Sequence, residues 1–216
     1  MLAISEPHSW RDGETVVVAP MGHHNWVKFL PTAQNTVGRW AIRSMLWIRK
    51  DLEAVQITVD SSDITAAVVQ LPNRAVLVAS VYVPRGNRTP LALQQTLNYI
   101  QQLIRKAHRQ ASTRMDILIV GDFNRHDQLW GRDNILARRQ GEADPIIDLM
   151  GEFSLHSLLE RGTKTWIGQE GIESTVDLTL ASEELAAEMI RCTTYEIEHG
   201  SDHLAIESVF DIEPLV

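Results

Sequence analysis

The sequence holds a single cysteine, Cys192, among its 216 residues. One thiol cannot build an internal disulfide framework or a cysteine-based zinc site, and it is compatible with a reducing compartment. No apolar run approaches the roughly 18 to 20 residues that a transmembrane helix needs. The first residues also lack the basic segment that opens a signal peptide. These absences predict a soluble, intracellular protein.

Positive charge is also scarce. Lys and Arg number 20 against 28 Asp and Glu, which gives a formal net charge of -8. Proteins that coat nucleic acid nonspecifically rely on Lys and Arg to neutralise phosphates, so that class is disfavoured. A nuclease is not excluded, because carboxylates can bind divalent cations that then bridge to phosphate. The hydrophobic fraction of 44% and the length favour one globular domain over residues 1–216.

Strand patterns dominate what is present. Segments rich in Val, Ile and Thr alternate with Gly, Asp, Asn or Pro, as expected for consecutive strands. Residues 75–83 are almost continuously apolar, which predicts a central strand covered on both faces, and residues 72–74 before them are typical of a hairpin turn. The predicted strands are 2–4, which resembles a truncated strand, 14–19, 43–48, 54–59, 63–71, 75–83, 116–120, 154–158, 163–167, 175–181, 194–198 and 203–210.

Three helices are expected among these strands. Thr89 and Pro90 supply an N-cap and a proline at the first helical position, and apolar residues then recur at spacings of 3 and 4 as far as Ala107. Two further helices are expected to start at Asp144 and Ser182. Many strands with few helices favour an α/β sandwich, in which two packed mixed sheets are flanked by helices in four layers.

Acidic residues stand at the ends of several predicted strands. They are Glu6, Asp122, Asp177 and Asp202, the last followed by His203. A rigid sheet can gather residues at its strand ends that are distant in sequence. Hard oxygen ligands suit Mg²⁺, which takes one or two carboxylates, keeps several waters and accepts substrate phosphate. The pattern favours phosphoryl chemistry, although a lone Asp after a strand is more often a turn or cap residue.

Asp177 differs from the other acidic residues because it interrupts an otherwise apolar alternation. An unpaired buried carboxylate is costly, so Asp177 needs a partner such as an imidazolium. His203 is a natural candidate, although an isolated histidine more often has a structural role. Orientation by a carboxylate favours a functional role for the histidine.

Five motifs, in order, resemble the signature blocks of the endonuclease/exonuclease/phosphatase superfamily. They are Ser5-Glu6-Pro7, Tyr82-Val83-Pro84, Gly121-Asp122-Phe123-Asn124, the segment 174–180 and the segment 200–203. Within the superfamily, residues 122–131 and 174–182 are most similar to the apurinic-endonuclease-like endonucleases of non-LTR retrotransposons.

The resemblance implies a role for each matching residue. Glu6 would bind Mg²⁺, with Mn²⁺ as an alternative, and Asp202 would support metal binding or the histidine. Asp122 would deprotonate the attacking water, which Asn124 would help to hold. Tyr82 would contact the phosphate, and the Asp177–His203 pair would stabilise the pentavalent charge. The candidate substrate-binding residues are Arg85, His126, Arg132 and Ser174.

The function implied is that of a metal-dependent phosphodiesterase that nicks duplex DNA. The 3′-hydroxyl left behind would prime reverse transcription, with a reverse transcriptase fused to the chain or encoded with it and a nuclear site of action. Two alternatives stay open. One is a phosphoesterase acting on abasic DNA, RNA or a small phosphorylated molecule, and the other is a degenerate domain that keeps only the fold.

The start of the sequence departs from the family pattern. The family places an Asn on a strand well before the metal-binding Glu and commonly a Gln directly before it, whereas Glu6 here follows Met1 closely and Ser5 precedes it. The expectation is therefore a domain that lacks its first strand, in which either the activity or only the fold is retained.

Overall fold

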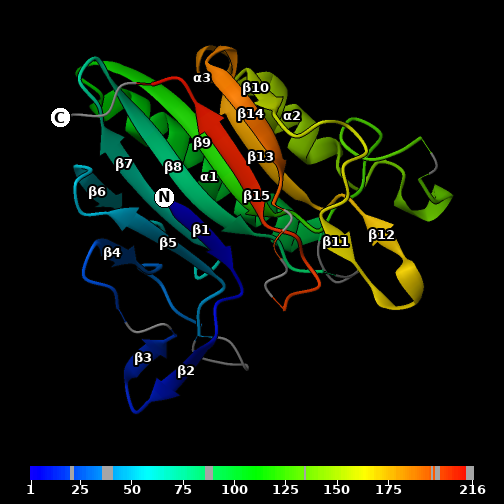
Figure 1. Cartoon of the computed structure of the whole chain (residues 1–216), viewed down its shortest axis with the longest axis horizontal. Helices are drawn as coiled ribbons and strands as arrows, with labels where there is room; N and C mark the ends of the chain where they lie inside the picture. Colours follow the sequence, from blue (N-terminus) through cyan, green and yellow to red (C-terminus); the bar gives the residue numbers. More distant parts are fainter. Residues whose placement is uncertain are drawn as a thin grey trace.

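A six-stranded mixed sheet is the largest element of the computed structural model, which describes residues 1–19, 22–35, 41–85, 90–133, 135–195, 197 and 200–212 (Figure 1). The strand order is β10-β13-β9-β8-β7-β6. Only β8 and β9 run parallel, and every other neighbouring pair is antiparallel. The strands are β6 (Ala54–Ile57), β7 (Ile64–Gln70), β8 (Arg74–Tyr82), β9 (Arg114–Asp122), β10 (Leu155–Ser157) and β13 (Asp177–Ser182).

Both faces of β8 are buried, which confirms the central strand predicted from its apolar sequence. Successive side chains of a strand point to opposite faces. Leu77 and Ala79 accordingly belong to the core under the helices, whereas Val76 and Val78 belong to the core on the other side of the sheet. The predicted hairpin turn before β8 is also confirmed, because the backbone N–H of Leu71 donates to the carbonyl of Arg74.

Two helices cover one face of the large sheet and lie behind it in Figure 1. They are α1 (Pro90–Gln110) and α2 (Asp144–Glu152). Leu97, Ile100 and Ile104 of α1 are fully buried at the predicted spacing, and burying each such side chain contributes about 1.5 to 3 kcal/mol. The predicted N-cap Thr89 lies outside the described residues. None of the helices in the described segments has the length and apolar character needed to cross a membrane.

The opposite face of the sheet packs against two smaller sheets, which confirms the predicted sandwich. One is antiparallel, in the order β1 (Leu2–Ser5), β5 (Ser44–Arg49) and β4 (Trp26–Phe29), and the other is the hairpin of β14 (Met189–Thr194) and β15 (Ile206–Phe210). Leu46 and Ile48 of β5 share a core with Val69 and Val78. The short helix α3 (Glu183–Ala187) adds Leu185 to this core.

The outer side of the β1-β5-β4 sheet packs against a hairpin within the described residues. This hairpin consists of β2 (Ser9–Asp12) and β3 (Thr15–Val18), and Val18 forms a core cluster with Ile42, Met45 and Trp47. The helices expected around the sandwich are therefore found on one outer face of the described chain and not on this one.

Several predicted strand boundaries were wrong. The strand expected at 194–198 overlaps β14 (Met189–Thr194) at Thr194 alone, and residues 196 and 198 lie outside the described residues. The strand expected at 163–167 shrinks to β11 (Trp166–Ile167), which pairs with β12 (Glu173–Ser174). Two 3-10 turns, η1 (Ala137–Arg139) and η2 (Gln169–Gly171), and the strands β2 and β4 were not predicted.

Candidate active site

Three predicted site residues lie in one row across three neighbouring strands. Tyr82 at the end of β8 pairs in register with Asp122 at the end of β9, and Asp122 pairs with Asp177 at the start of β13. Because β8 and β9 are parallel and β13 is antiparallel to β9, two strand ends and one strand start meet at the same edge of the sheet. The sheet register thus brings three distant sequence motifs together, and we call them the Tyr82–Asp122–Asp177 row.

Each residue of the Gly-Asp-Phe-Asn motif has a distinct structural task. Gly121 has φ +145°, and a Cβ there would lie 1.9 Å from the carbonyl oxygen of Val81, so only glycine fits between β8 and β9. Phe123 is fully buried. Asn124 has φ +50°, and this turn lets its backbone N–H and its Nδ2 donate to the two carboxylate oxygens of Asp122, at 2.9 and 2.6 Å.

The pairing predicted for Asp177 is confirmed, because its Oδ2 lies 2.8 Å from Nδ1 of His203. Thr165 holds both ends of this pair in place. Its hydroxyl accepts the backbone N–H of Asp177 at 3.0 Å, and its carbonyl accepts the N–H of Leu204 at 2.7 Å. The imidazole is therefore oriented by a side chain on β13 and by the backbone of its own loop.

The pKa values of the site reflect an excess of negative charge in a buried place. Burial, followed by the charge of Asp177, raises the pKa of Asp122 to about 7, against the opposing effects of His203 and Arg85. Burial by itself lowers the pKa of His203, but its hydrogen bond to Asp177 and the nearby carboxylates raise the net pKa above the usual value. The imidazolium form of His203 is thereby favoured.

Tyr82 and Glu6 form the other side of the site. Glu6 follows β1 with φ +48°, and its backbone N–H donates to the carbonyl of Arg43 at 2.9 Å. Burial, the charge of Glu6 and a hydrogen bond to that carboxylate raise the pKa of Tyr82, so its hydroxyl stays protonated. The Arg43 guanidinium lies 5.0 Å from the centre of the Tyr82 ring. The predicted metal ligand Glu6 is therefore placed beside the predicted phosphate contact Tyr82.

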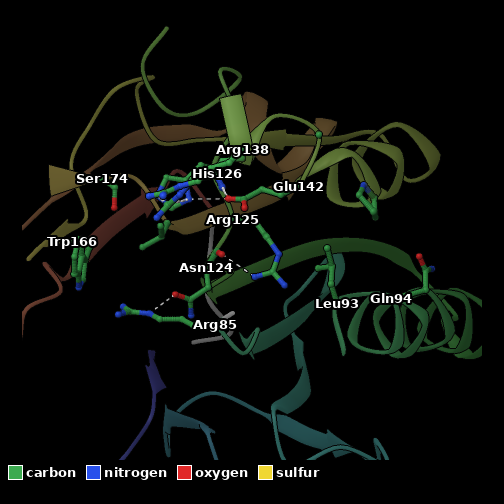
Figure 2. A pocket seen from close by; sticks show the side chains of 14 residues that line it. Arg85, Leu93, Gln94, Asn124, Arg125, His126, Arg138, Glu142, Trp166 and Ser174 are labelled. Carbon is green, nitrogen blue, oxygen red and sulfur yellow. Dashed lines mark hydrogen bonds and ion pairs between the residues drawn. The ribbon is translucent and has the colours of Figure 1, made fainter. Parts of the chain in front are cut away.

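Arg85 reaches into the site from the chain that follows β8. Its Nε donates to Oδ1 of Asn124 at 2.6 Å, and its guanidinium lies 5.3 Å from the centre of the Trp166 ring (Figure 2). The indole N–H of Trp166 in turn donates to Oδ2 of Asp202 at 2.8 Å. Trp166 is thus a partner of both Arg85 and Asp202.

A cavity of about 840 Å³ opens beside Asn124 (Figure 2). Arginine guanidinium groups suit phosphate because they offer paired donors in a planar fork. Three of the four predicted substrate-binding residues line this cavity, namely Arg85, His126 and Ser174. Its other basic lining residues are Arg125, Arg138 and Arg139. The lining fits a polyanion.

A second cavity of about 400 Å³ shares His126, Arg139, Trp166 and Ser174 with the first. The fourth predicted substrate residue, Arg132, lines this one. The two cavities together are lined by all four predicted substrate residues, and Trp166 and Ser174 of the β11–β12 hairpin line both of them.

His126 is held by a partner that the sequence did not reveal. Its backbone N–H and its Nδ1 both lie within hydrogen-bonding distance of Oε1 of Glu142, at 2.8 and 2.9 Å, and Arg139 also contacts the ring. Burial and the charge of Arg139 lower the pKa of His126 despite Glu142. No motif joins these residues, so only the folded chain shows the contact.

One group of potential metal-binding side chains is found within the described residues. The ligand atoms of Asp122, Asp177 and His203 all lie within 4.8 Å of one another. The two carboxylates supply hard oxygen donors of the type that Mg²⁺ prefers. Burial and then the charge of Asp177 raise the pKa of Asp122, and a bound cation would offset the second of these effects. Glu6 and Asp202 are outside this group, so their roles as metal ligands stay predictions.

Comparisons with known proteins agree with this fold. Residues 76–207 match the model of a family described as endonuclease-reverse transcriptase. The solved endonuclease domain of TRAS1, a telomere-specific non-LTR retrotransposon, is similar with 21% identity and a TM-score of 0.71, covering 88% of this chain and 82% of that one. The comparison with curated protein sequences gives no match.

Two further solved structures share the fold. The AP endonuclease LMAP from Leishmania major has 12% identity and a TM-score of 0.71, with 91% of this chain and 73% of that one covered. The catalytic domain of Xenopus laevis APE2 has 16% identity and a TM-score of 0.65, with 89% and 78% covered. At such identities the likeness establishes the architecture.

Proposed function

Because the chain belongs to the endonuclease-reverse transcriptase family within the endonuclease/exonuclease/phosphatase superfamily, we propose that it hydrolyses phosphodiester bonds of duplex DNA. The observation that carries this proposal is the Tyr82–Asp122–Asp177 row with His203 bonded to its third member. It combines a base, a phenol and an oriented imidazole at one edge of a sheet, beside a cavity lined by arginines.

Asp122 is the proposed general base. A side chain whose pKa is near the working pH transfers protons most effectively, and burial raises the pKa of Asp122 to about 7. In the proposed reaction Asp122 takes a proton from a water molecule, the water oxygen bonds to phosphorus, and the bond from phosphorus to the 3′-oxygen breaks. That oxygen takes up a proton, so the products are a 3′-hydroxyl and a 5′-phosphate.

His203 and Tyr82 are proposed to stabilise the charge that grows on the phosphate oxygens. Donors held in place before the reaction are effective because they need no reorganisation during it. Asp177 and Thr165 fix the imidazole, and the raised pKa of Tyr82 keeps its hydroxyl a donor. Asn124, whose backbone and amide are bonded to Asp122, is proposed to keep the base oriented toward the water.

Mg²⁺, or Mn²⁺ in its place, is the proposed cofactor. Glu6 would hold it, with Asp202 in support, and the bound ion would neutralise charge on the phosphate. The oxygen-rich donor set and the repulsion between Asp122 and Asp177 support this assignment.

The proposed biological setting is a retroelement. The TRAS1 structure is an endonuclease domain of a non-LTR retrotransposon, and the family model joins an endonuclease with a reverse transcriptase. We infer that the nick supplies a 3′-hydroxyl for a reverse transcriptase on the same or an associated chain. Access to chromosomal DNA would place this step in the nucleus.

Plasmid nicking tests the proposal. With Mg²⁺ the protein is expected to convert supercoiled plasmid to the open circular form, and EDTA or the near-isosteric Asp122→Asn change is expected to abolish the conversion. If supercoiled plasmid stays intact and Asp122→Asn has no effect on any phosphodiester, only the fold is retained. Rates on plain duplex, abasic duplex, RNA and a phosphoinositide identify the substrate, and a preference for the phosphoinositide would overturn the DNA assignment.

A further inference from the structure

Arg85 contacts two side chains of the site, those of Asn124 and His203. Besides the bond from its Nε to Oδ1 of Asn124, its terminal nitrogen lies 3.0 Å from Nε2 of His203. A guanidinium can only donate hydrogen bonds, so this contact belongs to the neutral form of His203, with Nε2 as the acceptor and the ring proton on Nδ1, toward Asp177. In the imidazolium form, which the nearby carboxylates favour, both ring nitrogens are donors and Arg85 keeps its bond to Asn124. Arg85 therefore joins Asn124 and His203 from the solvent side.

Asn124 and His203 contact Arg85 through atoms other than those that bond to Asp122 and Asp177. Nδ2 of Asn124 donates to Asp122 and to the carbonyl of Val83, and Nδ1 of His203 faces Asp177. Oδ1 of Asn124 and Nε2 of His203 point the other way and meet the same guanidinium. A phosphate oxygen bound by His203 would occupy the place where this guanidinium now lies.

The surroundings of Arg85 stabilise its positive charge at this position. The indole of Trp166 lies against the guanidinium, an arrangement that attracts a cation to the ring face and fixes the plane of the donor fork. Arg85 also lines the cavity that carries Arg125, Arg138 and Arg139. In a chain with a formal net charge of -8, this gathering of arginines marks a local site for anions.

We propose that Arg85 is a catalytic residue that binds the phosphate being cleaved, an inference that rests on the proposed phosphodiester hydrolysis. In the free protein its guanidinium is bonded to Asn124 and His203. When the phosphate enters, its oxygens replace these acceptors and Arg85 donates to the phosphate. A fork of donors from arginine matches phosphate geometry, whereas lysine presents only a compact point charge.

Nicking by Arg85 variants tests the catalytic role. Arg85→Ala is expected to lower kcat/KM by about 10²-fold, the typical loss when one donor to transition-state charge is removed. Added guanidinium ion is expected to restore part of the rate, and Arg85→Lys to keep little of it. Thermal unfolding should match the unaltered protein, because Arg85 is exposed. The matched control is Arg49→Ala, which removes one exposed positive charge at the far end of β5, where Arg49 pairs with Asp51.

Binding without turnover separates this proposal from the proposed hydrolysis. In EDTA, the affinity for a duplex oligonucleotide is measured at several salt concentrations. The plot of log K against log salt has a negative slope, and losing one phosphate contact makes that slope less steep by about 0.9. Arg85→Ala is expected to show this loss, and Arg49→Ala is not. A protein that never nicks but shows the Arg85-specific change in slope would contradict hydrolysis and still support the phosphate contact.

Two results would overturn the role of Arg85. One is faster nicking or tighter binding by Arg85→Ala, because Arg85 would then only obstruct the site. The other is behaviour of Arg85→Ala that equals that of Arg49→Ala in both assays.

Discussion

The Asp177–His203 hydrogen bond is the main contact that raises the pKa of the imidazole. Asp177→Asn removes the main influence that raises the pKa of His203, so the protonated donor is lost at lower pH. We expect kcat/KM to fall by about 10²-fold or more, and the alkaline limb of its pH profile to move to lower pH. A profile that keeps its alkaline limb while the rate falls would contradict this assignment of the limb to His203.

The Asp177–His203 pair also predicts the direction in which stability changes with pH. Because the folded-state pKa of His203 is raised, the pair's contribution is fully present below the unfolded-state pKa, about 6.5, and is lost as pH rises through the folded value. The difference in Tm between the unaltered protein and Asp177→Asn should therefore be largest in mildly acidic buffer and smallest in alkaline buffer, with both measured in EDTA.

At the scale of residues, prediction from the sequence succeeded where the burial of one charged side chain required a partner of opposite charge. A carboxylate at 177 within an apolar strand requires a cationic partner, and His203 supplies it. The bonds of Arg85 and the contact between His126 and Glu142 could not be foreseen in the same way. All of these residues are polar groups in loops that solvent could satisfy equally well, so only their proximity in the fold selects them.

At the scale of elements, the junction of β8 and β9 depends on Gly121. A Cβ at this position would meet the carbonyl oxygen of Val81 at 1.9 Å, and the φ of +145° is itself unfavourable for an L side chain. Gly121→Ala is expected to lower the free energy of unfolding by about 2 to 4 kcal/mol, in the upper range for single substitutions, and to displace Asp122. Urea unfolding and plasmid nicking measure the two effects.

A second glycine provides the control for this change. Gly151 lies in α2, where an added Cβ meets nothing within 4 Å. Gly151→Ala is expected to leave nicking unchanged and to raise stability by up to about 1 kcal/mol, because alanine is the better helix former. Equal effects of the two substitutions would show that the close approach of β8 and β9 does not constrain Gly121.

Elements with a strong physical signature were predictable, and short or polar ones were not. The continuous apolar run of β8 and the spacing of α1 indicate burial on two faces and on one face, respectively. Strand β2 has the sequence Ser-Trp-Arg-Asp, and β11 and β12 have two residues each. Such strands form because a neighbouring segment pairs with them, and their own sequence does not indicate that pairing.

At the scale of the whole molecule, a buried ionic network joins the large sheet to the second layer at the sheet edge opposite the active site. Asp116 is fully buried and accepts hydrogen bonds from Arg74 at 3.0 Å and Arg114 at 2.9 Å. Arg74 also pairs with Glu188, which lies between α3 and β14. The network thus links β8 and β9 to the start of the β14–β15 hairpin.

Asp116→Asn is expected to lower the free energy of unfolding by about 1.5 to 3 kcal/mol, because a buried carboxylate that accepts charge-assisted hydrogen bonds from Arg74 and Arg114 is lost. Urea denaturation measures this loss. Nicking by the fraction that stays folded should be unaffected, since Arg74 and Arg114 stand at the starts of β8 and β9 and the catalytic row stands at their ends. A loss of activity without a loss of stability would show that the two edges of the sheet are coupled.

The register of the Tyr82–Asp122–Asp177 row also constrains where the gene can gain or lose codons. One residue inserted within β8 or β9 would turn every following side chain of that strand to the opposite face, and Tyr82 or Asp122 would leave the row. Insertions in the segments that connect these strands would leave the row intact. Length variation among related sequences is therefore expected between the motifs, and the strand segments that lead into them are expected to be free of it.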